Sequence, residues 1–308
     1  MNKIQPQTYI IMKKILLLIC LLINTLQVFS QDDLLNMLPD SKTPEPVTGT
    51  FKANRIINGQ SIETVASHHL DYRISHRFGT INSGAYQLYG LDQGYIYMGF
   101  DYGITNNLMV GLGRSSEQKM INLYAKMKVL RQKTNGGTPF SITLMGEGYA
   151  DMFRYPIEDG RTNLSKYSYM AQALIARKIS NKLSVQISPT YLYRNRNNEN
   201  GEANGVISVG LAGRYKLSKR TAFVGEYFYV LPDQINTKYK DALSFGFDFE
   251  TGGHVFSLHF TNSTGMIAKQ FIAETTDTWA DGGIHFGFNL GRSFGLGKKY
   301  RAEHKVVN

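Results

Sequence analysis

Two histidines, His259 and His285, carry imidazole groups of the kind that bind divalent metal ions, and both lie in stretches where polar and apolar residues alternate. In an extended strand this alternation places both imidazoles on the polar face. Closure of such strands into a barrel would bring Asp71 and Arg73, from the first alternating stretch, alongside His285. Imidazole and carboxylate groups together can bind zinc or a similar ion, but a network of hydrogen bonds and ion pairs inside a polar lumen explains the same residues. We favour the network, and we assign neither a metal ion nor another cofactor.

A larger set of charged and histidine side chains shares this position on the polar face of an alternating stretch. The set contains both signs of charge, which is typical of a polar interior without a clear ion selectivity. We interpret these side chains as candidates for lining a lumen: Asp71, Arg73, Asp101, Lys126, Lys128, Glu147, Arg214, Asp248, Glu250, His259 and His285.

One group of residues suggests nucleophilic chemistry. His259, Asn262 and Ser263 have the residue types that lipolytic outer-membrane barrels use, but here all three lie at the end of a single predicted strand. A nucleophile and its base need side chains that converge on each other. A lipid hydrolase is therefore only a third hypothesis, and we assign no catalytic residue and expect no enzyme.

These side chains need strands to position them, and the clearest pair of strands runs from Ala242 to Asn262. Every second residue on both arms is a large apolar residue, while the positions between hold mostly Ser, Gly, Asp, Glu or His, so the period is two. The turn Thr251–His254 contains two glycines, which can adopt the positive φ of tight turns. The apolar positions are Leu243, Phe245, Phe247, Phe249, Phe256, Leu258 and Phe260.

The same pattern continues along the chain with no helix to cover the apolar face. Most of the stretches have the roughly nine to eleven residues that a tilted strand needs to cross a bilayer. The sequence therefore predicts an all-β fold, a single antiparallel transmembrane β-barrel of about 12 strands in up-and-down meander order. The expected strands are Thr64–Phe78, Gly94–Gly103, Leu108–Arg114, Met120–Arg131, Phe140–Asp151, Tyr167–Lys178, Leu183–Arg194, Gly205–Lys216, Ala222–Val230, Ala242–Glu250, His254–Asn262 and Gly283–Phe294.

The connections between these strands alternate between short and long, and only the short link Ser115–Lys119 breaks the alternation. Tight turns on one side and extended loops on the other are typical of bacterial outer-membrane barrels, whose turns face the periplasm. Aromatic residues gather near both strand ends, as in the girdles at the two membrane surfaces. We therefore expect the apolar face to contact outer-membrane lipid, because open strand edges in hydrocarbon would leave backbone groups unpaired.

The N-terminus predicts export. Lys13 and Lys14 precede an apolar run, and Val28–Gln31 fits a signal-peptidase site, so we expect residues 1–30 to be a signal peptide cleaved near Ser30. Cys20 is the only cysteine and lies inside this run, so the mature chain would have no thiol chemistry. Removing three lysines leaves 31 basic against 24 acidic residues, and the formal charge falls from +10 to +7. The remaining basic residues are scattered, which argues against a nucleic-acid partner.

The polar stretch at residues 31–63 has no strand period. We interpret it as a periplasmic arm, with a plug or a docking segment as the alternative. The barrel is expected at residues 64–294 and a C-terminal tail at 295–308. The long loop Ser263–Gly282 contains Trp279 and is unusually apolar, so it either narrows the mouth, binds a partner or packs on other loops, and we favour packing.

Several motifs, in one order, resemble an uncharacterised family of Bacteroidetes β-barrel proteins known only as a domain of unknown function. The resemblance covers nearly all of the mature chain. It implies an outer-membrane or envelope barrel and implies no reaction. The chain departs from the commonest ending of such barrels because it continues to Asn308 instead of closing on a terminal aromatic residue. The motifs are Phe51–Arg55, Ile74–Gly79, Gly90–Asp92, Gly113–Ser116, Leu174–Lys178, Thr251–Phe256 and Ile284–Asn289.

Two functions follow from a polar lumen in an outer-membrane barrel. The first is porin-like passage of a small polar solute. The second is a non-conducting barrel that anchors or docks an envelope complex, with the N-terminal arm as the contact to an envelope protein. A barrel of about 12 strands lies between small barrels filled by side chains and open porins, so its bore is narrow or plugged.

Overall fold

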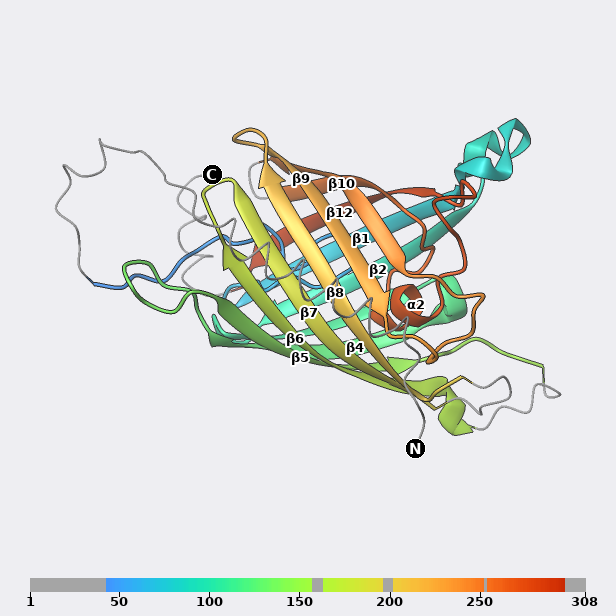
Figure 1. Ribbon diagram of the computed structural model, residues 1–308, viewed down its shortest axis with the longest axis horizontal. Coiled ribbons are helices and arrows are strands. Elements are labelled where there is room, and N and C mark those ends of the chain that lie inside the picture. The colour runs from blue at the N-terminus through green and yellow to red at the C-terminus, as the bar shows by residue number, and fades with distance from the viewer. Residues whose placement is uncertain (1–42, 157–162, 196–201, 252–253, 297–308) are drawn as a thin grey trace, which may run out of the picture. The chain divides into compact units, whose positions relative to one another are not determined.

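The computed structural model describes residues 43–156, 163–195, 202–251 and 254–296. Within these residues the chain forms a closed barrel of twelve antiparallel strands with a few short helices (Figure 1). The predicted signal peptide, residues 31–42 of the predicted arm, the glycines of the 251–254 turn and the tail from residue 297 lie outside the described residues.

Every predicted strand corresponds to an observed one, and four of the predicted ranges coincide with the observed bounds. The largest difference is at the start of the first strand, predicted at Thr64 and observed at His69. The observed strands are β1 (His69–Thr80), β2 (Gly94–Gly103), β3 (Leu108–Ser115), β4 (Ile121–Leu130), β5 (Ser141–Ala150), β6 (Tyr167–Lys178), β7 (Leu183–Arg194), β8 (Gly205–Lys216), β9 (Thr221–Val230), β10 (Ala242–Thr251), β11 (His254–Thr261) and β12 (His285–Gly295).

Each strand pairs with its sequence neighbours, and β1 pairs with β12 to close the barrel. In the closing seam Asp71 lies opposite Ser293, and Arg73 lies opposite Gly291. Closure leaves no strand edge unpaired, which is the requirement for strands in hydrocarbon. The predicted all-β antiparallel barrel in meander order is therefore confirmed.

The two ends of the barrel differ in their connections. Among the described residues, the turn end holds the links at residues 104–107, 131–140, 179–182 and 217–220. The loop end holds the longer links, which contain the 3-10 helices η2 (Ile81–Ser83), η3 (Ala85–Gly90) and η6 (Asn163–Lys166) and the α-helix α2 (Ala268–Ala273). The one short link at the loop end contains η4 (Glu117–Lys119).

The outward and inward faces alternate as the period of two predicts. On β4, for example, Leu123 is 62% exposed, while its neighbour Asn122 is fully buried. Tyr169 and Tyr191 are exposed near the loop end, and Tyr215 and Phe223 are exposed near the turn end. None of the helices among the described residues is long and apolar enough to cross a membrane.

Two segments occupy the inside of the barrel. The first, here called the plug hairpin (residues 50–66), enters from the turn end; the second, the mouth segment (residues 262–284), carries α2 at the loop end. In Figure 1 the blue segment that begins at residue 43 and helix α2 lie at opposite ends of the barrel. Residues 31–63 were predicted to form a periplasmic arm, with a plug as an alternative, and the structure buries most of residues 50–63 inside the barrel, as the plug alternative requires.

Candidate functional site

The plug hairpin enters and leaves the barrel at the same end. Before it, the backbone N–H of Val47 donates to the carbonyl of Gln132 at 2.8 Å, and after it the N–H of His68 donates to the carbonyl of Gly103 at 2.8 Å. Both acceptors belong to the turn end, since Gln132 follows β4 and Gly103 ends β2. The hairpin is therefore inserted into the lumen without being threaded through it.

The tip of the plug hairpin (residues 55–60) is held by one carboxylate of the barrel wall. Glu226 on β9 accepts hydrogen bonds from three consecutive backbone N–H groups, those of Ile57 at 3.2 Å, Asn58 at 2.7 Å and Gly59 at 3.0 Å. The two oxygens of a carboxylate offer about four acceptor sites, so one side chain can satisfy all three donors. Glu226 thus forms a latch between the wall and the plug.

The side chain of Asn58 joins the same tip to two other strands. Its Oδ1 accepts a hydrogen bond from Nη2 of Arg77 on β1 at 2.5 Å, and its Nδ2 donates to Oγ of Ser244 on β10 at 3.1 Å. Both wall residues are almost completely buried. The tip is therefore bonded to β1, β9 and β10, which lie on one side of the barrel.

Two lysines of β4 bind the arms of the plug hairpin. The ammonium group of Lys126, which is fully buried, donates to the carbonyls of Asn54 at 3.1 Å and Glu63 at 2.6 Å and to Oε1 of Gln60 at 3.3 Å. Lys128 forms an ion pair with Glu63 at 2.9 Å. These contacts are polar, and water can replace each of them when a segment moves.

A small apolar cluster completes the contact between plug and wall. The plug contributes three isoleucines and a phenylalanine, and the wall contributes small or branched residues that face inward. The members are Phe51, Ile56, Ile57 and Ile62 from the plug and Leu174, Ala176 and Val224 from the wall.

At the loop end the mouth segment folds inward, and α2 is buried along its whole length. Phe271 packs on Phe228 of β9 with ring centroids 4.8 Å apart. Two hydrogen bonds fasten the segment to η4 on the far side of the mouth, from Thr264 Oγ1 to Glu117 Oε1 at 2.9 Å and from Gln270 Nε2 to the Glu117 carbonyl at 3.1 Å. The apolar loop thus packs on another loop, as the sequence analysis favours, and it also narrows the mouth, which is the first of the three alternatives.

Glu117 is a titratable part of this fastening. The pKa of its carboxyl is raised to about 7. Burial is the largest cause and the nearby Glu274 also raises the pKa, while the hydrogen bond from Thr264 lowers it. Lys269 of α2 pairs with Glu274 at 2.7 Å. The link that holds the mouth segment therefore contains a carboxyl whose pKa lies near neutral pH.

The plug tip and α2 almost meet in the middle of the barrel. A cavity of about 10 Å³ lies between Asn58 and Gly59 of the tip and Ala268 and Phe271 of the mouth segment. This space holds about one water molecule. The lumen is thus filled from both ends at this level.

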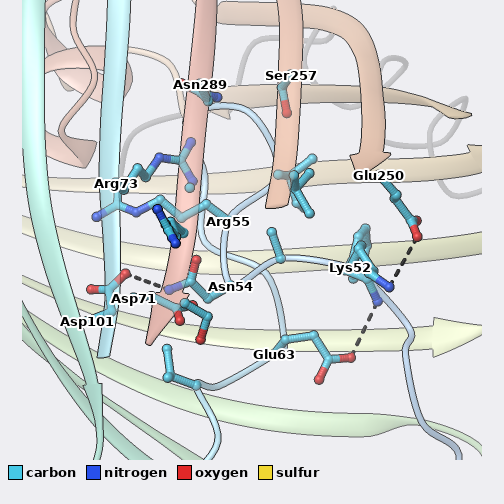
Figure 2. A pocket seen from close by; sticks show the side chains of 18 of the residues that line it. Lys52, Asn54, Arg55, Glu63, Asp71, Arg73, Asp101, Glu250, Ser257 and Asn289 are labelled. Carbon is cyan, nitrogen blue, oxygen red and sulfur yellow. Dashed lines mark hydrogen bonds and ion pairs between the residues drawn. The ribbon is translucent and has the colours of Figure 1, made fainter. Parts of the chain in front are cut away.

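Between the plug hairpin and the wall lies a larger cavity, here called the vestibule, of about 650 Å³. Figure 2 shows side chains of the plug, among them Asn54 and Arg55, and of the wall, among them Arg73 and Asn289, around this space. Its lining includes Arg220 of a turn-end link, so the vestibule lies toward the turn end.

All eleven predicted lumen residues lie on the inward face of their strands, and most of the acids bond to neutral partners. Asp101 accepts from Asn54 Nδ2 at 2.5 Å and from the hydroxyl of Tyr124. Glu147 accepts from Asn122 at 2.6 Å. Asp248 accepts from Ser257 at 2.5 Å, and Asp71 lies in the vestibule wall.

The predicted basic residues divide between ion pairs and plug contacts. Arg214 pairs with Glu250 at 2.6 Å, and Glu250 also pairs with Lys52 of the plug at 3.1 Å. Arg73, Lys126 and Lys128 bond to the plug hairpin. The structure thus brings five of the predicted residues into contact with the plug hairpin, namely Arg73, Asp101, Lys126, Lys128 and Glu250. Asp71 lies beside them in the vestibule lining, and His285 lies apart near the mouth.

The metal hypothesis placed Asp71 and Arg73 alongside His285, and this expectation is wrong. The closing strands are antiparallel, so Asp71 and Arg73 near the start of β1 lie opposite Ser293 and Gly291, whereas His285 pairs with Thr80 at the other end of β1. His259 and His285 are diagonal neighbours on β11 and β12, but they bond to different groups. His285 bonds to the Phe78 carbonyl at 2.9 Å and to Asp277 at 3.0 Å near the mouth. His259 is fully buried and lies between Gly246 and Gly287, where a Cβ on either glycine would contact it. No group of three metal-binding side chains of the His, Cys, Asp or Glu type occurs within the described ranges.

The residues of the hydrolase hypothesis also bond elsewhere. Ser263 Oγ accepts from Thr275 at 2.9 Å, and Asn262 Nδ2 donates to backbone carbonyls. Neither ring nitrogen of His259 has a hydrogen-bond partner in the described part of the chain. The three side chains therefore form no nucleophile and base pair.

Sequence reasoning missed the residues that hold the plug tip. Glu226 and Arg77 lie on the inward face of predicted strands, so the period of two could have found them. Arg55 and Asn58 lie outside any periodic stretch, and no local signal places them inside a barrel.

The comparisons with known proteins agree with the barrel architecture. The model of the family DUF5777, described as a membrane-bound beta barrel domain, matches residues 51–294. A search of curated proteins gave no match.

Several solved structures are similar at low sequence identity. The NanC porin has a TM-score of 0.45 and 10% identity, over 73% of this chain and 98% of that one. The KdgM porin in complex with disordered oligogalacturonate has a TM-score of 0.44 and 9% identity, over 73% and 98%. An outer-membrane channel from Pseudomonas putida F1 has a TM-score of 0.45 and 12% identity, over 76% and 98%.

Proposed function

Because the chain belongs to the DUF5777 family of membrane-bound β-barrel domains, we propose that it is a gated barrel of the bacterial outer membrane. A small polar solute passes through its lumen when the plug hairpin withdraws. The observation that carries this proposal is that the hairpin fills the lumen while both of its arms leave at the turn end. It can therefore come out as a unit, and no strand has to separate from its neighbour.

The bonds between plug and wall suit a segment that moves. Glu226, Arg77, Ser244 and Lys126 hold the plug through hydrogen bonds that water can take over after withdrawal. Each such bond contributes only about 0.5–3 kcal/mol net. The wall left behind would be polar and hydrated, as in a channel that passes polar solutes.

The orientation follows from the turns and loops. In outer-membrane barrels the short turns face the periplasm, so the plug hairpin would enter from the periplasmic side. An envelope protein that pulls on the chain before Pro46 could then open the lumen. The chain would reach this membrane by export, with the signal peptide cleaved near Ser30 as the sequence predicts.

Conductance in planar lipid bilayers tests the proposal. The full-length protein, a variant lacking residues 50–66, and a variant lacking both 50–66 and 265–275 are compared after circular dichroism has confirmed strand content. We expect few openings for the full-length protein and stable open steps for the double deletion. Absence of current from a folded double deletion would refute passage.

A second function is favoured by one observation. The mouth segment closes the loop end independently of the plug, with α2 fully buried. A barrel closed from both ends can instead serve as a non-conducting anchor for an envelope complex, with the segment before Pro46 as the contact. In that case no variant conducts, and removal of residues 31–45 abolishes association with the partner and leaves the barrel folded.

A further inference from the structure

The charged side chains that line the vestibule differ in the partners to which they are bonded. All four carboxylates in its lining already have partners in the described structure, and that of Asp71 is the hydroxyl of Ser293. Glu63 pairs with Lys128, Glu250 pairs with Arg214 and Lys52, and Asp101 accepts from Asn54 and Tyr124. These acids are not free to bind a cation.

Two arginines in the lining of the same cavity have guanidinium groups that bond only to uncharged hydroxyl and carbonyl groups. Arg55 of the plug donates from Nη2 to the hydroxyls of Tyr97 at 2.9 Å and Tyr124 at 3.3 Å. Arg73 of β1 donates from Nε to Ser75 and from Nη2 to the carbonyl of Ile57, both at 3.0 Å.

Neither arginine has a carboxylate partner. The ion pairs among the described residues do not include Arg55 or Arg73. Both are at least nine-tenths buried, and Nε of Arg55 has no hydrogen-bond partner in the described structure. Asp101 acts on both arginines, and Glu147 acts on Arg55, from beyond ion-pair distance. The desolvation cost of these buried cations is therefore only partly offset, and an anion in direct contact would offset more of it.

Asp71 is the fourth carboxylate, and its position works against anion binding. It lies opposite Asp101 in the β1–β2 register and lines the vestibule. Its Oδ1 is buried without a hydrogen-bond partner in the described structure. Removal of its negative charge would therefore strengthen an anion site next to it.

We propose that the vestibule is a binding site for a small organic oxyanion, which bridges Arg55 of the plug hairpin and Arg73 of the wall. A guanidinium group presents two parallel N–H donors that match a carboxylate or a phosphate. The cavity volume of about 650 Å³ lies within the range of roughly 300–1,000 Å³ that is usual for small-molecule sites. Figure 2 shows both arginines entering this space from different parts of the chain.

Binding at this site also controls how readily the plug hairpin withdraws from the lumen, an inference that rests on the proposed function. The oxyanion contacts both plug and wall, so it binds the plugged state better than the open state. Because the vestibule lies at the turn end, a ligand arriving from that side holds the barrel closed. Its concentration there sets how often the plug hairpin withdraws.

Isothermal titration of the detergent-solubilised full chain at low salt tests the binding. The probes are citrate for a carboxylate, inorganic phosphate for a phosphate, and glucose as a neutral control. We expect saturable binding of citrate or phosphate and none of glucose. Equal binding of glucose, or no saturable binding of either anion, overturns the site.

Variants locate the binding. Arg73→Gln should weaken anion binding about tenfold or more, as expected for loss of a charged hydrogen bond. Arg131→Gln removes the same charge from a turn-end residue that bonds to Asn107 outside the cavity lining, and it should bind like wild type. Asp71→Asn should bind the anion several-fold more tightly, a gain that a misfolded protein cannot show. Unchanged affinity in both Arg73→Gln and Asp71→Asn overturns the proposal.

Anion binding at the vestibule and passage through the barrel are tested by different measurements, so either inference can be refuted without the other. Titration measures the site in the plugged state, whereas conductance of the deletion variants measures passage. If anions bind and no deletion variant conducts, the site stands and the proposed function falls. If the double deletion conducts and no anion binds, only the site is refuted.

Discussion

Oε1 of Glu226 lies 2.7 Å from the backbone nitrogen of Asn58, and this contact joins the barrel wall to the tip of the plug hairpin. The two residues are separated by 168 positions in the chain. The neighbouring N–H groups of Ile57 and Gly59 donate to the same carboxylate. The latch therefore depends on one side chain, and a single substitution tests it.

Glu226→Gln should loosen the plug tip. The glutamine amide presents two N–H groups where three backbone donors need an acceptor, so at least one buried donor loses its partner at a cost of about 1–3 kcal/mol. Hydrogen–deuterium exchange of the amides of residues 57–59 should accelerate about tenfold or more. Glu202→Gln, which removes a partner of Arg194 near the loop end, serves as the control and should leave these amides unchanged. Equal protection in both variants would show that Glu226 is not the latch.

The mouth segment should loosen as pH rises. The pKa of Glu117 is about 7 in the closed mouth, above the usual value near 4.3 for an exposed glutamate. The closed mouth therefore favours the protonated carboxyl, so its stability is greatest below about pH 4.3 and declines as pH rises to about 7. Lys269 and Glu274 of the segment and Arg77 of β1 are the other charged groups acting on this carboxyl.

Exchange of the α2 amides, corrected for intrinsic rates, measures this effect. The opening constant should increase by up to about tenfold per pH unit between pH 5 and 7, which is the limit for one proton. Glu117→Gln should remove most of this dependence. A wild-type profile that is flat over this range would contradict the assignment.

Gly287 should be intolerant of a side chain. A Cβ at this position would lie 2.6 Å from Nε2 of His259 and 2.7 Å from the carbonyl oxygen of His76. Gly287→Ala should therefore lower the free energy of unfolding by about 1–3 kcal/mol, as overpacking usually does. Gly213→Ala is the matched control, because its Cβ would have only a distant contact at 3.9 Å. Urea unfolding in lipid vesicles would compare the two, and equal stability would refute the close packing around His259.

A charged residue on the outward face should lower the stability of the barrel only where that face contacts the membrane. Leu123 is 62% exposed on β4, and Tyr86 is 96% exposed in η3 beyond the strands. Leu123→Arg should destabilise the vesicle-inserted barrel by up to about 2–4 kcal/mol, while Tyr86→Arg should change stability little. If both substitutions are neutral, the outward face does not contact lipid.

The period of two predicted the wall of the barrel well. It placed Leu123 outside and Asn122 inside, and it located β2, β6, β7 and β8 at their observed bounds. Such success is expected because alternation is a local property that each strand carries in its own sequence.

The contents of the lumen were harder to predict. Residues 50–66 have no period, and their partners, such as Glu226 for Asn58, are distant in sequence. The sequence of the plug hairpin therefore predicted a polar arm outside the barrel. The short link that contains η4 broke the alternation of turns and loops, and the structure shows that α2 and Thr264 dock against this link. The one link that departed from the alternation of turns and loops is thus the link that contacts the mouth segment.

Single-channel recording on a reversibly locked plug tests the central claim most directly. In a Cys20→Ala background that also lacks residues 265–275 of the mouth segment, so that only the plug hairpin closes the barrel, Asn58→Cys and Ser244→Cys replace two side chains that lie 3.1 Å apart. A reducible thiol cross-linker joins the two cysteines. The loss of the Asn58 side chain also removes its bond to Arg77, so the unlocked tip should be weakly held. We predict no openings while the link is intact and frequent openings in the same membrane after reduction. Openings of equal frequency before and after reduction would show that the plug hairpin is not the gate.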